Sequence, residues 1–590
     1  MKTRSSILSL IAFTLIVVTL YSFSGRDKEL VDKTNFETAA INNLKNTNKN
    51  VNQTIQEKIQ LFEFPTVDLF NLSDSRDGSS AREFVSTANF LDIDRSVLEE
   101  INNTKPENFT LEIPMNDGSI VLVDLTKNDI LAEGFNIAEM TNGLLHDYTP
   151  GLYYKGVVRG KELFSLAAIS VFSDHIMGIV SDEEGNWNLG PVRDENNNYT
   201  SEYIYYNDVD LTVKNEFKCG MEGIEQESTF PAKDFDKTLF QSGTGLDNPS
   251  STVPLKVYFV ADYSLYVAAN GNLQTLADYI TGFFNSVSTI YQNESIPFQI
   301  AYIAAYTNPD PMVNGPSTYE MRQIFGAQIQ NNMQGGDIAH LLSIRNDVSG
   351  GLAYIRSLCQ PYNPADSSGS YCVSVIEGNY EPYPNFSWTV TVVAHEMGHN
   401  VGSRHTHACV WPQPGGGIGP IDTCIINGEN STFSGFPEAC IPIQPVSGCY
   451  SPANGTLMSY CHFCNTTFLG NGFGPLPGDT VRLRFMQAQN CLIGIENISS
   501  QIPNDFSLKQ NYPNPFNPTT RIEFNIKQSG FVKLAVYDML GKLVGTLVDG
   551  DLNPGTYQYT FEAESLPSGT YFYRLETVGF AETKRMILLK

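Results

Sequence analysis

The sequence predicts three folded parts: a mainly-β N-terminal region, an α/β domain, and a C-terminal β-sandwich. Three observations lead to this prediction. The 590 residues are too many for one core, because domains usually contain roughly 100 to 200 residues. Alternating strand and helix patterns begin at Val253, after a region of short alternating apolar runs. A proline-rich stretch after Ser499 introduces a second set of short runs.

The first 25 residues have the layout of a secretory signal peptide. Lys2 and Arg4 precede an apolar run from Ile7 to Leu20, and small residues follow up to Gly25. The run is shorter than the roughly 20 residues that span a bilayer. We therefore expect a cleaved leader, with an uncleaved membrane anchor as the alternative. No later stretch is apolar enough to cross a membrane, so we expect no stable membrane span.

Strand-like alternation fills the region before Val253. Residues 26–60 are polar and rich in Asn and Lys, which is typical of a loosely ordered start or a surface helix. Short apolar runs between Phe109 and Val213, separated by Gly, Asn and Asp, predict an antiparallel β domain. The alternation stops between Glu222 and Ser251, where Asp, Ser, Gly and Pro predict a linker.

Longer patterns follow in the rest of the chain. Strands and helices that alternate from Val253 predict a sheet layer covered by helices. Six short runs between Gly and Pro turns after Ser499 predict a small β-sandwich. The predicted strands are Leu255–Val260, Phe298–Tyr306, Ile338–Ile344, Arg521–Ile526, Val532–Tyr537, Lys542–Val548, Tyr557–Phe561, Thr570–Leu575 and Lys584–Leu589, and the predicted helices are Leu273–Tyr291 and Tyr319–Asn332.

Charge and cysteine content narrow the function classes. A net charge of −27 argues against nucleic acid and anionic membrane surfaces as partners, because both would repel the chain. Cys219 stands alone in the first half, and the other nine of the ten cysteines lie between Cys359 and Cys491. Export favours disulfides among them, and an odd number leaves at least one unpaired. Cys461 and Cys464 form a single CxxC, for which disulfides are a better explanation than a second metal site.

The segment from Thr391 to His407 reads TVVAHEMGHNVGSRHTH and carries the main chemical signal. His395 and His399 are four residues apart, so on a helix they point at one ion. Gly402 can take a positive φ, which ends the helix and lets His405 supply a third nitrogen.

Three imidazoles leave one position of a tetrahedral zinc ion open for water, as in catalytic rather than structural sites. Glu396 lies beside the predicted metal and can take a proton from that water as it attacks a carbonyl carbon. The spacing H-E-x-x-H-x-x-G-x-x-H favours a metal site over a solvated helix face. His407 is expected to lie at the surface or to support a ligand.

The stretch from His395 to His405 resembles the zinc signature of the metzincins, a group of zinc metallopeptidases. Gly455 to Tyr460 resembles their Met-turn, which implies that Met458 forms a hydrophobic floor under the metal. Within the metzincins, residues from about Val253 to Ile493 most resemble the reprolysin (adamalysin) branch, through Asp337–Leu342 and Gly351–Tyr354. That resemblance implies that Gly351, Leu352 and Ala353 belong to the edge strand that holds a peptide substrate, although an ordinary Gly-Gly turn is an alternative.

Two residues depart from the reprolysin pattern. Thr406 stands where reprolysins usually have Asp, and Ser459-Tyr460 stands where their Met-turn continues Ser-Pro. A tyrosine at this position is similar to the astacin and serralysin branches. Tyr460 is therefore a candidate catalytic donor to the transition state, with a packing role as the alternative.

Sequences on either side of the catalytic segment add two further resemblances. Phe217 to Glu222 is similar to the cysteine-switch motif of reprolysin propeptides, in which the Cys219 thiolate would fill the open zinc position; a packed or disulfide-bonded cysteine is the alternative. Residues 505–590 resemble a type A sorting domain of the type IX secretion system of Bacteroidota, through Asn511–Pro518, Val536–Gly541 and Leu566–Tyr571. The alternative is an adhesion or carbohydrate module on a similar sandwich.

The sequence therefore predicts a secreted zinc metalloendopeptidase in four segments. We expect a signal peptide at 1–25, an inhibitory mainly-β propeptide at 26–250, a metzincin catalytic domain at 251–498 and a sorting domain at 505–590. For the catalytic domain, the resemblance implies an α/β fold with a twisted mixed sheet and a zinc helix. The expected cofactor is one catalytic Zn²⁺, and Ca²⁺ has no assignable ligands. Protein or peptide substrates and the type IX secretion machinery are the expected partners, and passage through the periplasm leads to the medium or the cell surface. The alternative is a catalytically inactive, zinc-containing surface adhesin or binding protein.

Overall fold

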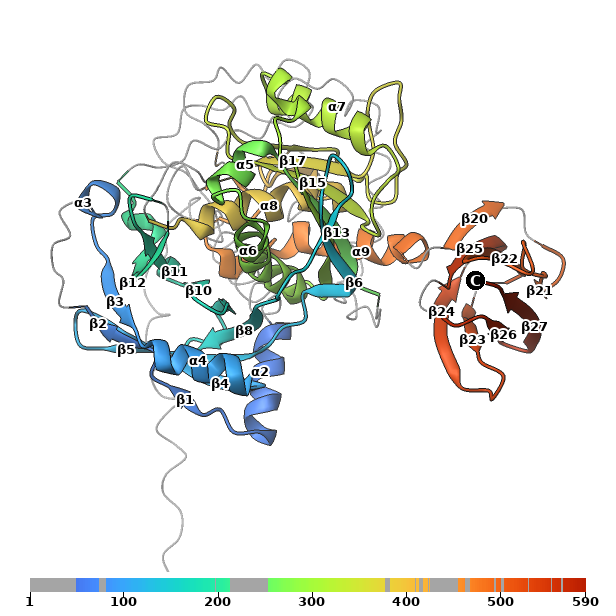
Figure 1. Ribbon diagram of the computed structural model, residues 1–590, viewed down its shortest axis with the longest axis horizontal. Coiled ribbons are helices and arrows are strands. Elements are labelled where there is room, and N and C mark those ends of the chain that lie inside the picture. The colour runs from blue at the N-terminus through green and yellow to red at the C-terminus, as the bar shows by residue number, and fades with distance from the viewer. Residues whose placement is uncertain are drawn as a thin grey trace, which may run out of the picture.

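The structure is a computed structural model that falls into three units, the N-terminal unit (residues 49–212), the central unit (253–492) and the C-terminal unit (495–590) (Figure 1). It describes residues 49–73, 81–196, 198–212, 253–376, 383–408, 410–412, 418–422, 424, 455–461, 467–492, 495–499, 503–528, 530–552, 554–563 and 566–590. The predicted signal peptide, Cys219 and the predicted linker lie outside these ranges. Within them, no helix is both long enough and apolar enough to cross a bilayer.

The N-terminal unit is built on a ten-stranded sheet. Its neighbours pair antiparallel, except that β1 and β4 are parallel. Helix α2 (Lys49–Leu61) buries Val51 and Ile55 against Val157, so the polar start contains a helix with one packed face. In sheet order the strands are β1 (Thr66–Val67), β4 (Asn108–Pro114), β5 (Ile120–Lys127), β8 (Leu152–Val158), β9 (Leu166–Val171), β10 (Ile176–Asp182), β11 (Gly185–Arg193), β12 (Tyr199–Asn207), β3 (Asn89–Ile93) and β2 (Phe70–Leu72).

The central unit contains a seven-stranded sheet. The sheet is mixed, as predicted. Five neighbouring strands are parallel, and β16 and β7 are antiparallel to their neighbours at the two edges. In sheet order the strands are β16 (Gly351–Ala353), β17 (Tyr371–Val375), β15 (Ile338–Ser343), β13 (Leu255–Ala261), β14 (Phe298–Ala305), β6 (Leu131–Glu139) and β7 (Leu145–His146). The three strands predicted between Leu255 and Ile344 begin and end within one residue of β13, β14 and β15, whereas β17 was not predicted.

Two strands of this sheet come from the N-terminal unit, which the sequence did not predict. β6 pairs parallel with β14, from Leu131 opposite Ile300 to Glu139 opposite Ala305. Alternation along β6 indicates a strand but does not say which sheet it joins, because a period of two specifies faces and not partners. The sheet therefore crosses the predicted boundary at residue 250.

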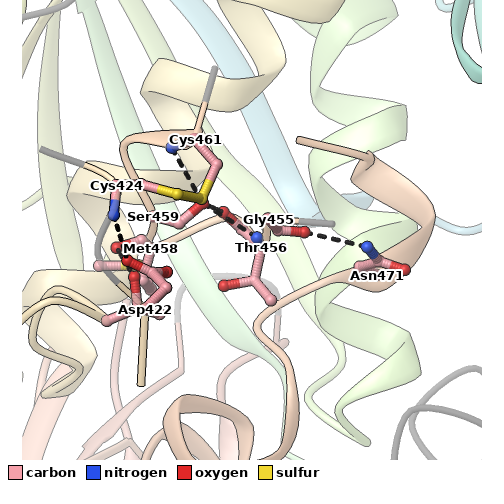
Figure 2. The surroundings of a disulfide bond; sticks show 9 residues. Asp422, Cys424, Gly455, Thr456, Met458, Ser459, Cys461 and Asn471 are labelled. Carbon is pink, nitrogen blue, oxygen red and sulfur yellow. Dashed lines mark hydrogen bonds between the residues drawn. A yellow bond between two sulfur atoms is a disulfide. The ribbon is translucent and has the colours of Figure 1, made fainter. Parts of the chain in front are cut away.

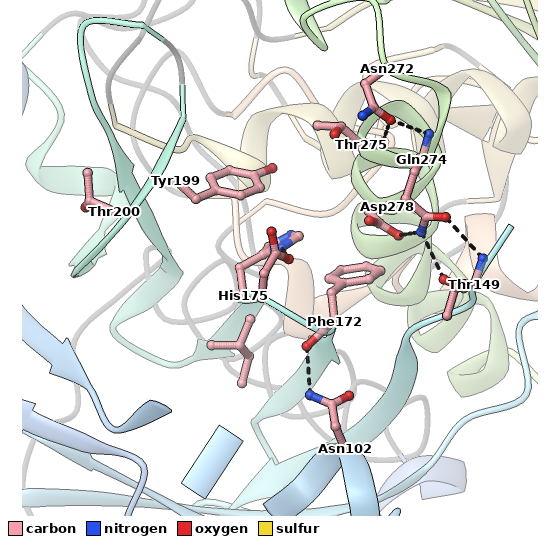
Figure 3. Close-up of polar contacts among 12 residues, drawn as sticks. Asn102, Thr149, Phe172, His175, Tyr199, Thr200, Asn272, Gln274, Thr275 and Asp278 are labelled. Atoms are coloured by element: carbon pink, nitrogen blue, oxygen red, sulfur yellow. Dashed lines mark hydrogen bonds and ion pairs between the residues drawn. The ribbon is translucent and has the colours of Figure 1, made fainter. Parts of the chain in front are cut away.

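Helix α6 (Leu273–Asn293) lies between the two sheets and is buried on almost every side. Asn272 caps it by accepting the N–H groups of Gln274 and Thr275 (Figure 3). Gly282 allows a close approach, since a Cβ there would lie 2.3 Å from Sδ of Met177 in β10. Phe172, Met177 and Ile179 of the N-terminal unit belong to the same core cluster as α6. Burying one large apolar side chain stabilises a fold by roughly 1.5–3 kcal/mol, so this shared core holds the two units together.

The remaining elements complete the central unit. Helix α7 (Thr318–Ile329) packs Met321 and Phe325 against Tyr258 and Leu341 in a second core cluster. Helix α8 (Phe386–Val401) packs against α6, where the Tyr291 hydroxyl donates to the Ala394 carbonyl at 3.0 Å. Its shorter elements are α5 (Tyr263–Ala268), β18 (Trp411–Pro412), β19 (Ile418–Gly419), η4 (Pro311–Asn314) and η6 (Leu469–Asn471), and the unit ends with α9 (Pro475–Leu492). The N-terminal unit also contains α3 (Ala81–Phe84), α4 (Arg95–Thr104) and η1 (Asp208–Asp210).

The C-terminal unit is rich in β-strands and lies to one side of the other two (Figure 1). Two four-stranded sheets enclose a core cluster that is drawn only from residues 506–588. One sheet contains β20 (Ile495–Ser499), β25 (Gly555–Glu562), β22 (Thr519–Ile526) and β21 (Ser507–Leu508), and the other contains β24 (Leu543–Leu552), β23 (Gly530–Tyr537), β26 (Gly569–Thr577) and β27 (Phe580–Leu588). This unit therefore has a core of its own.

Candidate metal centre

Helix α8 places the first two histidines of the signature. His395 and His399 lie one turn apart, and the helix ends at Val401. Gly402 follows with a φ of +133°, and its N–H donates to the Gly398 carbonyl at 3.0 Å. Glycine tolerates this backbone conformation because it has no Cβ. The turn predicted from the sequence is therefore present, and it ends α8 and directs the chain back alongside it.

The turn brings His405 to the other two histidines. The Nε2 atoms of His395, His399 and His405 lie 3.1 to 3.2 Å from one another. All three imidazoles are buried. The three ligand nitrogens therefore converge on one point inside the protein, where they could hold a metal ion.

Backbone carbonyls fix the tautomers of two of these rings. Nδ1 of His395 lies 2.8 Å from the Leu457 carbonyl, and Nδ1 of His399 lies 2.8 Å from the Ser403 carbonyl. Because a carbonyl only accepts, each Nδ1 carries the hydrogen and each Nε2 keeps a lone pair. Burial also lowers the pKa of His395 to about 4, which favours the neutral ring. Metal-binding histidines commonly donate their other ring nitrogen in this way.

The donor set fits a zinc ion. At a Zn–N distance of about 2.0–2.1 Å in a tetrahedron, ligand nitrogens lie roughly 3.3 Å apart, close to the distances seen here. Two acceptor nitrogens cannot hydrogen-bond to each other, so the close pair formed by His395 and His399 requires a positive charge between them. Neutral imidazoles are ligands that zinc prefers.

Glu396 lies beside the triad and against the sheet edge. Its side chain is fully buried. A Cβ placed on Gly351 of β16 would lie 2.4 Å from Oε1 of Glu396 and 2.5 Å from its Cγ. The carboxyl group is therefore enclosed between α8 and the backbone of the edge strand, where any side chain at position 351 would displace it.

The segment that resembles a Met-turn lies under the triad. Met458 is fully buried, and its Sδ would lie 2.9 Å from a Cβ built on Gly398 of α8. The Met458 carbonyl accepts the N–H of Thr406 at 3.1 Å. Thr406, which departs from the reprolysin pattern, therefore joins the segment after the third histidine to this turn.

Two aromatic rings border the triad. The ring of Tyr460 lies 4.9 Å from that of His405, and Tyr460 is 3% exposed. The ring of His407 stacks on His405 at 4.9 Å and is partly exposed. His407 therefore lies next to the candidate ligand His405, as expected of a residue that supports a ligand.

A disulfide that the sequence could not assign holds the turn (Figure 2). Cys461 pairs with Cys424 rather than with Cys464. Asp422 accepts the Cys424 N–H at 3.2 Å, and burial raises the pKa of its carboxyl to about 6. Cys372 is a free, buried thiol, which agrees with the odd number of cysteines.

The structure brings most of the predicted site residues together. His395, Glu396, His399 and His405 meet with Met458 and Tyr460, while Gly351, Leu352 and Ala353 form edge strand β16. Cys219 lies outside the described residues, so its predicted contact with the metal is not placed. Sequence reasoning missed the carbonyls of Leu457 and Ser403, because backbone acceptors leave no signal in residue type.

Comparison with known proteins agrees with these features. Residues 251–437 match the model of metallo-peptidase family M12, named Reprolysin_5. Residues 510–589 match the model of the secretion system C-terminal sorting domain. A zinc metalloproteinase-disintegrin-like protein of Cerberus rynchops is 25% identical over 181 residues, which is 29% of this chain and 28% of that protein. The chain therefore matches less than a third of the length of this curated relative.

These matches support a zinc protease, since family M12 implies zinc and the triad could bind it. The sorting domain implies export by a type IX secretion system and so a secreted or cell-surface protein. Residues 251–437 are therefore similar to the metallopeptidases of family M12, and residues 510–589 are similar to secretion system C-terminal sorting domains.

Proposed function

We propose that the protein is a secreted zinc-dependent endopeptidase of the metzincin type that hydrolyses peptide bonds in proteins. The observation that carries this proposal is the convergence of three buried imidazoles, with Nε2 atoms 3.1 to 3.2 Å apart, beside a buried carboxyl group. A set of three protein ligands leaves a zinc coordination position open, which is characteristic of catalytic sites.

Glu396 is the proposed general base. When bound, the zinc ion would supply a Lewis acid that polarises the peptide carbonyl and lowers the pKa of water toward about 7. Glu396 accepts a proton from the attacking water and then gives it to the nitrogen of the leaving amine. Helix α8 and the Gly351 backbone hold the carboxyl group in place for both transfers.

Other residues take supporting roles in this proposal. The Tyr460 hydroxyl would donate a hydrogen bond to the oxyanion that develops on the substrate carbonyl. Met458 forms an apolar floor beneath the histidines. The substrate would lie extended along β16, because an edge strand has backbone N–H and C=O groups that can pair with another chain.

The proposed segments are a signal peptide (1–25), an inhibitory region (26–250), the catalytic domain (251–498) and the sorting domain (505–590). In the inhibitory region, Cys219 would offer its thiolate to the open zinc position and keep the enzyme latent. Cleavage in the predicted linker would separate Cys219 from the catalytic domain in the chain, so that the thiolate could leave the open zinc position.

Metal removal tests the proposal. We expect the purified protein, once cut in the predicted linker, to hydrolyse a mixed peptide library, to lose this activity on chelation and to regain it with one equivalent of Zn²⁺. The variant His399→Ala should bind zinc much more weakly and should not be rescued by the same addition. Sequencing of the product termini identifies endopeptidase cleavage. Zinc binding without cleavage of any peptide would instead favour a non-catalytic binding protein.

A further inference from the structure

The contacts between the N-terminal and central units indicate that the N-terminal unit has a structural role in addition to the proposed inhibition. Strands β6 and β7 are the last two strands of the central sheet, next to β14. Removing them would expose the pairing edge of β14, and exposed strand edges promote aggregation. The same step would uncover a core cluster that includes Ile130, Ile137 and Phe172 from the N-terminal unit.

Buried polar groups of α6 also depend on the N-terminal unit. Asn285 donates to the carbonyls of Tyr154 and Ile169 at 2.9 and 3.1 Å, and it accepts from Asn128 at 2.8 Å. Asn285 is fully buried. If the N-terminal unit left, this side chain would exchange those partners for water, and each such bond makes a modest net contribution to the association.

The N-terminal unit caps the helix that carries the histidines. The first four N–H groups of a helix have no partner within it. Oδ1 of Asn188, in β11, accepts the N–H of Ser387 at 2.8 Å, and its Nδ2 donates to Oγ of Ser387 at 3.2 Å. Nearby, the Tyr206 hydroxyl donates to the Pro384 carbonyl at 2.7 Å. The start of α8 is therefore held by side chains from a different unit.

A second contact supports the turn under the triad. Oδ1 of Asn186 accepts the N–H of Leu469, and Oγ of Ser181 accepts the N–H of Gly470, at 2.8 and 2.9 Å. Leu469 and Gly470 belong to η6. Asn471 of the same element donates to the carbonyl of Gly455, at the start of the turn, at 2.9 Å (Figure 2). The N-terminal unit thus contacts helix α8 directly and supports the turn through η6.

We infer that the N-terminal unit is a retained structural subunit of the metal centre, and that the mature protein is a two-chain complex. A cut between Thr212 and Val253 breaks the covalent link between the two units but leaves residues 49–212 bound to the central unit. The partner of the β14 edge and of the α8 N-terminus is therefore this chain's own N-terminal unit. The inference does not depend on peptidase activity.

The test cuts the full chain without self-cleavage. A site for a specific protease is placed within residues 222–251 in the Glu396→Ala background, and complete cutting is verified under denaturing conditions. We expect the two fragments to elute together on native size exclusion at micromolar concentration, with zinc bound. Separation of the fragments under these conditions would overturn the inference, whether or not the larger fragment stays soluble.

A matched pair of variants tests the cap. Asn188→Ala should raise the dissociation constant of the cut complex about tenfold at a fixed, sub-denaturing urea concentration, the effect expected for loss of a helix cap. The control is Asn89→Ala, because Asn89 is also buried but bonds only to Tyr205 and Asn116 of its own unit. Equal effects of the two variants would contradict the capping role of Asn188. Co-elution of the fragments and the dissociation constant are both measured without peptidase activity, so failure of the proposed function would not affect them.

Discussion

The two β-rich regions that flank the catalytic segment are attached to it in different ways. The N-terminal unit contributes β6 and β7 to the central sheet and shares its core cluster. The C-terminal unit encloses a separate core, drawn from residues 506–588, and follows α9 along the chain. Strand content alone therefore does not distinguish a unit that is part of the catalytic fold from one that is appended to it. The two are distinguished by whether the strands and core residues of the unit belong to the sheet and core of the central unit.

Deleting the N-terminal unit should have the largest effect. A chain that begins at Val253 leaves the β14 edge and the α6 surface exposed, so we expect it to aggregate or to lack zinc. Soluble yield and zinc content per chain measure the outcome. Supplying residues 26–252 as a separate chain should restore both, and a soluble, zinc-loaded protein without them would remove the difference between the two β-rich regions.

A change at the opposite edge of the same sheet should come next. Gly351→Ala places a Cβ 2.4 Å from Oε1 of Glu396, so the carboxyl group must move. Misplacing a catalytic group by about 1 Å can lower the rate roughly a hundredfold. We expect kcat to fall while zinc content stays the same. Gly326→Ala in α7 is the control, because its Cβ would meet no atom closer than 3.4 Å; similar rates for the two variants would exclude this positioning role.

A smaller effect is expected at the contact between Asp278 of α6 and Tyr148 of the N-terminal unit. The Tyr148 hydroxyl donates to Oδ1 of Asp278 at 3.0 Å. Gln274 Nε2 donates to the same oxygen at 3.0 Å (Figure 3). Burial raises the pKa of Asp278 to about 7. The folded state therefore binds more protons than the unfolded state between about pH 4 and pH 7, and stability falls as the pH rises through this range.

The variant Asp278→Asn keeps the accepting oxygen and removes the charge. We expect it to raise the free energy of unfolding by about 1–3 kcal/mol at pH 8, which is several degrees in Tm. The gain should shrink toward pH 4, where the carboxyl of the folded parent is protonated and uncharged like the amide. Thermal unfolding at the two pH values is the measurement, with the exposed Asp92→Asn as control. A gain that is independent of pH would contradict the assigned titration.

Deleting residues 505–590 should have the smallest effect on catalysis. The central unit keeps its core and its histidines without them, so we expect the rate of the purified, linker-cut protein to change by less than about twofold, as for independent domains. Export should fail, because the sorting domain is lost. Cell fractionation and a peptide assay measure the two effects. A large loss of activity would show that the C-terminal unit is also integral.

The sequence was sufficient for features that depend on local spacing. His395 and His399 share a helix face because they are four residues apart, and Gly402 ends that helix because it tolerates a positive φ. Strands β13, β14 and β15 and helices α6 and α7 also followed from apolar periodicity, whereas α5, β17 and α9 did not. These signals lie within a few residues of one another and need no knowledge of the tertiary fold.

Features that depend on distant partners could not be predicted. β6 has the alternation of a strand, yet nothing in it specifies pairing with β14, about 170 residues later. The pairing of Cys424 with Cys461 is one of many connectivities that the cysteine count permits. Asn188 is an ordinary asparagine in sequence, and its role at the start of α8 appears only when the two units are folded together.

The proposed function depends on Glu396, and one variant tests this role most directly. In the linker-cut protein, Glu396→Ala leaves His395, His399 and His405 unchanged and removes only the proposed base. We predict that peptide hydrolysis falls by roughly a hundred- to ten-thousandfold, the usual effect of losing a general base, while one zinc ion per chain remains bound. Near-normal turnover by the purified, zinc-loaded variant would contradict the proposed mechanism.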